Sequence, residues 1–146
     1  MAMKRIKEQV RRSDNSFVMK RHADVNRFIR ELPFRLTGAQ LKALDDVFVD
    51  FSSDYTMTRL VQGDVGSGKT VIATLALLNT AKCGYQGAFM APTEVLAKQH
   101  YHGLSEQLKP YGIRVGLLIG STTKKQKESL EREKEIRRNN QIIIYE

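Results

Sequence analysis

The chain has 146 residues, of which 41% are hydrophobic and 27% are charged, and its formal net charge is +8. This length fits a single domain with a buried core, and the composition excludes a chain that is disordered throughout. No apolar run approaches the roughly 18 residues of a membrane span, and the basic N-terminus lacks the apolar segment of a signal peptide. The single cysteine, Cys83, excludes an internal disulfide. We therefore expect a cytoplasmic protein.

The positive charge is concentrated towards the two ends of the chain. Residues 1–36 contain ten Lys and Arg against four acidic residues, and residues 121–140 contain seven against four. Residues 37–120 are balanced, with seven of each sign. Basic flanks suit a nucleic-acid partner because they attract its phosphates. Solvated helices explain the same charge, so both interpretations stay open on charge alone.

The first 31 residues are polar, basic and only weakly periodic. We interpret them as a helical connector of one or two pieces, with a break near residues 13–16, and Pro33 ends whatever helix precedes it. A second helix is expected to begin at Thr37, because Thr37 and Gln40 have the spacing of a capping box. Its apolar face is predicted to contain Leu41, Leu44, Val47 and Phe48.

The sequence GDVGSGKT, at residues 63–70, fits the pattern G-x-x-x-x-G-K-[ST]. Such a loop wraps its backbone N–H groups around phosphate oxygens, which the glycines permit. Lys69 can reach the β- and γ-phosphates, and the Thr70 hydroxyl can ligate Mg²⁺. A short strand over 59–63 and a buried helix over 69–82 are predicted around the loop, and a helix N-terminus favours an anion. The segment therefore predicts a site for ATP and Mg²⁺.

Strands and helices alternate through the rest of the chain. The expected strands cover residues 87–92, 113–120 and 141–146, and a charged helix covers 122–139. An amphipathic helix over 93–110 is predicted to turn Leu96, Leu104 and Leu108 towards the core and to stop at Pro110 and Gly112. Alternation of this kind is typical of right-handed βαβ units, which form a parallel sheet with ligands at the carboxyl ends of its strands.

Three segments together resemble a known family. LPFRLTGAQ (32–40), GDVGSGKT and APTEVLAKQH (91–100) occur in an order that closely resembles the first motor domain of RecG-type DNA helicases, members of helicase superfamily two. The resemblance covers about residues 32–144. It implies an α/β P-loop NTPase with a RecA-like parallel sheet flanked by helices, truncated, with the helical connector at 1–31 and the ATP-binding half of the motor domain at 32–146.

The resemblance also implies roles at the nucleotide. Gln40 would hydrogen-bond the adenine edge with Phe34 stacking near the base, and an amide suits this task because it can both donate and accept. Gln40 as a helix cap remains a compatible alternative. Lys69 and Thr70 would be the catalytic phosphate and Mg²⁺ ligands. The remaining loop residues would cradle the phosphates: Gly63, Asp64, Val65, Gly66, Ser67 and Gly68.

Nucleic-acid contacts are implied at two later positions. Pro92 and Thr93 stand where a strand meets a helix and would contact the backbone of the translocated strand, with Gln99 on the same track. The alternative for Thr93 is an ordinary helix N-cap. The segment LIGST (118–122) matches a later DNA-contacting element, usually TGS. Because Ile119 replaces the threonine, only Gly120 and Ser121 carry over.

The family uses ATP hydrolysis to translocate along duplex DNA, and it remodels stalled replication forks and Holliday junctions in DNA repair and recombination. The resemblance would continue with Gly-Thr-His, and the acidic DExH motif and the second motor domain are missing. We therefore expect a fragment that is inactive alone, although the full-length motor would be monomeric. QIIIY (141–145) is expected to form an exposed apolar edge through which copies associate.

Two other functions stay open at this point. One is a non-catalytic module in which the P-loop senses nucleotide and the basic flanks hold nucleic acid. The other is a fragment of a transcription-repair coupling translocase, a class that shares GDVG but usually has an aromatic residue where Ser67 stands.

Overall fold

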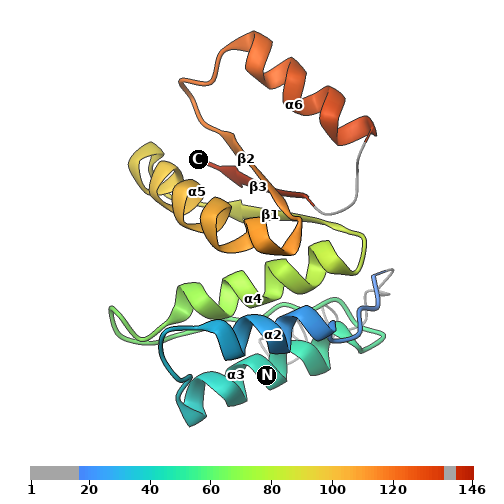
Figure 1. The fold of residues 1–146 in the computed structure, drawn as a ribbon, viewed down its shortest axis with the longest axis vertical. Helices are drawn as coiled ribbons and strands as arrows, with labels where there is room; N and C mark the ends of the chain where they lie inside the picture. The colour runs from blue at the N-terminus through green and yellow to red at the C-terminus, as the bar shows by residue number, and fades with distance from the viewer. Residues whose placement is uncertain (1–16, 137–140) are drawn as a thin grey trace, which may run out of the picture. The chain divides into compact units, whose positions relative to one another are not determined.

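The computed structural model describes residues 17–136 and 141–146, which fall into two compact units (Figure 1). The first unit ends at Ala76 and the second begins at Leu77. Helix α4 (Lys69–Lys82) contributes its first turns to one unit and its last turns to the other. The predicted break near residues 13–16 lies outside the described residues, and the proposed boundary between residues 31 and 32 stays a prediction.

Two helices, α2 (Ala23–Glu31) and α3 (Gly38–Phe51), supply much of the first unit. The apolar face of α2 buries Val25 and Phe28, and α3 buries residues spaced three and four apart, as a helix with one apolar stripe must. The backbone N–H of Met19 donates to the carbonyl of Phe51 at 2.8 Å, which joins the chain before α2 to the end of α3. The predicted apolar face of α3 is wrong at Leu41, which is 41% exposed near the helix N-terminus. The buried residues of α3 are Leu44, Val47, Phe48 and Phe51.

The predicted strand over residues 59–63 is not formed. A strand is defined by hydrogen bonds to a neighbouring strand, and β-prone residues alone do not supply one. Leu60 is 80% exposed, so this segment also lacks the packing that stabilises a strand. The predicted helix over 69–82 is confirmed as α4, and its Ile72, Leu75 and Leu78 are buried.

The second unit contains a parallel sheet of three strands, β1 (Gln86–Met90), β2 (Arg114–Leu118) and β3 (Gln141–Tyr145), in the order β1-β3-β2. Ala88 and Gly116 both pair with Ile143, from opposite sides. The prediction of a parallel sheet is confirmed, but the prediction that QIIIY forms an exposed edge is wrong. The chain crosses from β1 to β2 and returns to place β3 between them, so Ile142, Ile143 and Ile144 are at most 1% exposed.

Helix α5 (Glu94–Leu108) connects β1 to β2 and packs on β2 and β3. It buries Ala97, Leu104 and Leu108, whereas the predicted core residue Leu96 is 36% exposed because it lies in the first turn. The helix stops earlier than predicted, and the short 3₁₀ helix η1 (Lys109–Tyr111) follows it. Gly112, with φ of 69°, then reverses the chain into β2.

The charged helix α6 (Lys124–Ile136) connects β2 to the residues that precede β3. Its last predicted residues, 137–139, lie outside the described part of the chain. Among the helices that the structure describes, none combines the length and the apolarity that crossing a membrane requires.

Candidate nucleotide and nucleic-acid sites

The loop at residues 63–70 has the backbone that its glycines predict. Gly66 and Gly68 have φ of 79° and 84°, a region in which a side chain is strained. The N–H of Ser67 donates to the carbonyl of Asp64 at 3.0 Å and closes the turn. At Gly63 the constraint is space, because a Cβ atom there would require the Ser67 hydroxyl to move. The loop then enters α4 directly at Lys69, which places a helix N-terminus behind it.

The Lys69 ammonium lies on the loop itself. Its Nζ donates to the carbonyl oxygens of Gly63 at 2.5 Å and Asp64 at 2.8 Å, and it lies 3.4 Å from the Ser67 hydroxyl. A phosphate oxygen carries a formal charge and is a stronger acceptor than a peptide carbonyl. The loop therefore holds the Lys69 ammonium against its own carbonyl oxygens, which a phosphate oxygen could replace as acceptors. Lys69 and Thr70 are both exposed, in the first turn of α4.

Gln40 makes contacts that the sequence indicates only in part. The predicted capping box is confirmed: Gln40 Oε1 accepts from the Thr37 N–H at 2.8 Å, and the Gln40 N–H donates to Thr37 Oγ1 at 3.2 Å. In addition, Gln40 Nε2 donates to the carbonyl of Ser67 at 2.7 Å, across 27 residues of sequence. An amide can make two bonds at each end, so one donor and one acceptor position are left for a base. The adenine contact itself stays a prediction, as does the stacking of Phe34, which is 51% exposed.

Arg59 fixes the segment that leads into the loop. Its guanidinium lies 2.8 Å from Asp50 and 3.5 Å from Asp46, both on α3. The hydrogen bond to Asp50 raises the pKa of Arg59. Sequence analysis did not find this pairing, because it depends on how the segment 59–63 returns past α3.

The predicted nucleic-acid residues all lie in the second unit, on two loops and one helix. Thr93 is the N-cap of α5, and its Oγ1 accepts from the N–H of Leu96 at 3.3 Å, so the capping alternative is observed. Pro92, Thr93 and Ser121 are exposed. Ile119 is buried and donates its N–H to Thr122 Oγ1 at 2.9 Å, so the residue that departs from the family pattern belongs to the core. Gln99 is exposed and lies about 140° around the helix from Glu94, on a different face of α5.

Glu94 joins the two loops, a role that sequence analysis did not find. Its Oε1 accepts from Ser121 Oγ at 2.6 Å and from Lys98 Nζ at 2.7 Å. The bond from Lys98, followed by the bond from Ser121, lowers the pKa of Glu94. A second carboxylate, that of Glu146, accepts from the N–H of Gly120 at 3.1 Å. The only sequence signal was the i, i+4 spacing of Glu94 and Lys98, since the approach of Ser121 depends on the sheet.

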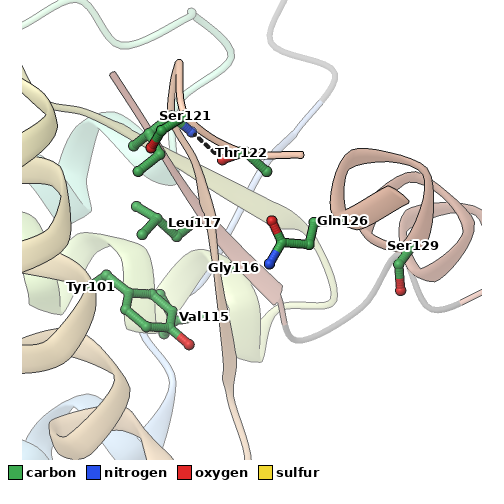
Figure 2. Close-up of a pocket in the computed structure, with 9 residues that line it drawn as sticks. Tyr101, Val115, Gly116, Leu117, Ser121, Thr122, Gln126 and Ser129 are labelled. Carbon is green, nitrogen blue, oxygen red and sulfur yellow. Dashed lines mark hydrogen bonds between the residues drawn. The ribbon is translucent and has the colours of Figure 1, made fainter. Parts of the chain in front are cut away.

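A cavity of about 430 Å³ lies along β2 (Figure 2). Figure 2 shows Tyr101 of α5, Leu117 of β2 and Gln126 of α6 around it, with Ser121 at one end. Ser121 is the only predicted site residue that lines it.

A glycine-rich loop that leads into a helix at a lysine and a threonine is typical of P-loop nucleotide-binding proteins. Among such proteins, the DEAD/DEAH box helicase family matches residues 37–145, and this chain belongs to that family.

Within the family the chain is similar to proteins named ATP-dependent DNA helicase RecG. It is 55% identical to the one from Aquifex aeolicus over 70% of this chain, and 50% identical to the one from Thermotoga maritima over 80%. A solved structure of RecG bound to a three-way DNA junction matches 99% of this chain with a TM-score of 0.83 and 38% identity. The chain spans 13% and 15% of the length of those two relatives and 19% of the chain in that structure.

Proposed function

We propose that this chain is the ATP-binding part of an ATP-dependent DNA helicase or translocase that remodels stalled replication forks and Holliday junctions in repair and recombination. The observation that carries the proposal is the loop at 63–70, in which a charged lysine lies on main-chain oxygens at the N-terminus of a buried helix. The RecG-type relatives, and the DNA junction in the matched structure, support DNA as the partner.

The residues of the loop fit a nucleotide. Two glycines of the loop are left-handed, a backbone that allows successive N–H groups to turn towards an anion. Lys69 could exchange its carbonyl acceptors for phosphate oxygens while it stays in the first turn of α4. Thr70 is the residue proposed to hold Mg²⁺, and Gln40, already fixed to Ser67, is proposed to read adenine. Bound Mg·ATP supplies the phosphoanhydride whose hydrolysis drives such motors. What this chain contributes is the binding and orientation of the phosphates.

The proposed DNA surface consists of Pro92, Thr93, Gln99, Gly120 and Ser121. The loop at 119–122 already binds negatively charged oxygens, because Gly120 donates to Glu146 and Ser121 donates to Glu94. A DNA backbone presents oxygens of the same charge, which supports a phosphate contact here. A DNA partner also supports a cytoplasmic location, and the proposed motor works as a monomer, with residues 1–31 as its connector.

Calorimetric titration of the chain with Mg·ATP tests the proposal. We expect saturable binding that Lys69→Ala weakens at least tenfold, because the variant removes a charged phosphate ligand. Lys42→Ala, an exposed lysine on α3, is the matched control and should bind like the unsubstituted chain. Equal affinity in the Lys69 and Lys42 variants would contradict the nucleotide site. ATP binding with no nucleic-acid binding would contradict the helicase part of the proposal.

A further inference from the structure

The hydroxyl of Ser121 is directed at a carboxylate of its own chain. A serine hydroxyl has one hydrogen to donate, and an ionised carboxylate can only accept. The 2.6 Å contact between Ser121 Oγ and Glu94 Oε1 therefore consumes the single donor of Ser121. While that bond exists, Ser121 cannot donate its hydroxyl to a phosphate.

The neighbouring donor is engaged in the same way. The N–H of Gly120 donates to Glu146 Oε2 at 3.1 Å, so two adjacent donors of one loop each hold a carboxylate oxygen. These carboxylates come from positions 26 and 27 residues away in the sequence, so local chain geometry does not impose either contact. The loop at 119–122 thus has the chemistry of an oxyanion-binding element.

Glu94 lies where any anion would be stabilised. It is in the first turn of α5, whose N-terminus favours negative charge, and the Lys98 ammonium contacts it at 2.7 Å. Ser121 is the third partner. A nucleic-acid phosphate at this loop would be stabilised by the same three groups, the N-terminus of α5, Lys98 and Ser121. The phosphate and Glu94 therefore compete for them.

We propose that Glu94 is an intramolecular substitute for a nucleic-acid phosphate, which occupies the Ser121 hydroxyl and the Lys98 ammonium until a backbone phosphate displaces it. This inference rests on the proposed DNA contact at Ser121. As a consequence, the affinity for nucleic acid is lower than it would be if the donors of the loop were unoccupied. The opposite possibility is that Glu94 braces Ser121 in a binding position, and it predicts that removing Glu94 weakens DNA binding.

The test is a double-mutant cycle measured by fluorescence anisotropy with a labelled DNA duplex at low salt. Glu94→Ala should tighten binding about threefold to tenfold, the range of one ordinary hydrogen bond at an exposed site. The same substitution in a Ser121→Ala background should give a smaller gain, because only Lys98 is then left to be released, and Glu106→Ala should give less still. Glu106 is an exposed carboxylate on the same helix, so its variant measures the effect of losing one negative charge.

Several outcomes overturn the inference. If Glu94→Ala binds DNA more weakly, Glu94 holds Ser121 in a binding position. If Glu94→Ala tightens DNA binding equally with and without Ser121, the gain comes only from the loss of a negative charge. If Glu94→Ala lacks a cooperative thermal transition, Glu94→Gln replaces it in the cycle. Gln retains an acceptor but not the charge, so its gain should be smaller than tenfold and still depend on Ser121.

Failure of the proposed function has a separate signature. The double variant Thr93→Ala/Gln99→Ala should weaken DNA binding if the proposed surface is right, whatever Glu94 does. If that variant weakens binding while Glu94→Ala has no effect, only the role of Glu94 is wrong. If neither variant changes binding, the surface itself is wrong and the inference falls with it.

Discussion

The loops at residues 63–70 and 119–122 are both turns that precede a helix, and groups of opposite charge occupy them. In the first, the Lys69 ammonium lies on carbonyl oxygens of the loop, and in the second, carboxylates lie on N–H and O–H donors. The charged group on the first loop comes from within six positions of its partners, whereas the carboxylates on the second loop come from 26 and 27 positions away. A loop built from local contacts can be recognised in a sequence, but one built across a sheet needs the fold.

The largest expected effect is on the sheet that brings the second loop together with its partners. Ile143→Ala removes a side chain that is 1% exposed at the centre of β3, and the cavity should cost about 2–5 kcal/mol of unfolding free energy. Urea denaturation measures the free energy of unfolding. The control is Leu60→Ala, because Leu60 is 80% exposed and its loss should change that free energy by less than about 0.5 kcal/mol. Hydrogen exchange should show that the backbone amides of β1, β2 and β3 lose protection. Equal loss of protection in α2 and α3 would mean that both units unfold together. The two loops would then not differ in the stability of the unit that carries them.

Gly68→Ala should damage the local loop. It places a side chain at φ of 84° and against the Gln40 amide, a strain of about 1–3 kcal/mol, and we expect Mg·ATP binding to fall at least tenfold. Gly38→Ala is the matched control, because nothing lies within 4 Å of a Cβ there. Thermal melting together with calorimetry checks both variants. A Gly68 variant that binds nucleotide normally would show that the loop does not need its left-handed backbone.

Gln40 offers a way to separate the long-range contact of the first loop from its local one. Gln40→Ala removes the side-chain bond of the capping box and the bond to Ser67 but keeps the Thr37 cap, and should cost about 0.5–1.5 kcal/mol of stability for each bond lost. Gln40→Glu keeps an acceptor for the Thr37 N–H but has no donor for the Ser67 carbonyl. We expect the Glu variant to keep most of the stability and to bind Mg·ATP more weakly. Calorimetry that finds normal binding in the Glu variant would show that the Ser67 contact does not shape the site.

The smallest expected effect is the dependence of stability on pH through Glu94. The hydrogen bond from Lys98, and then that from Ser121, lowers the pKa of this carboxylate below its ordinary value of about 4.3, so the ionised form is stabilised by folding. Its contribution is complete above that ordinary value and is lost as the pH falls through the lowered folded pKa. Glu94→Gln should therefore remove this contribution, so that stability falls slightly at neutral pH and the acid side of the stability curve below about pH 4.3 becomes flatter. Urea denaturation between pH 3 and 7 measures both arms, and an unchanged acid side would contradict the lowered pKa.

Several features could be predicted from the sequence because they depend on neighbours in the chain. The glycine pattern determined a loop with two left-handed residues before a helix at Lys69, and the spacing of Thr37 and Gln40 determined a capping box. The alternation of apolar runs with amphipathic segments determined a parallel α/β unit. Each of these rests on backbone preference or hydrophobic period, which a few consecutive residues define.

Other features were decided only by the tertiary structure. The order β1-β3-β2 made QIIIY the central strand, and the absence of strand pairing left residues 59–63 without a strand. The bonds from Gln40 to Ser67, from Arg59 to α3 and from Ser121 to Glu94 each join distant parts of the sequence. Sequence alone gives the residues that can form such pairs, but only the folded chain brings them within hydrogen-bonding distance, because strand order and loop paths depend on how the elements pack.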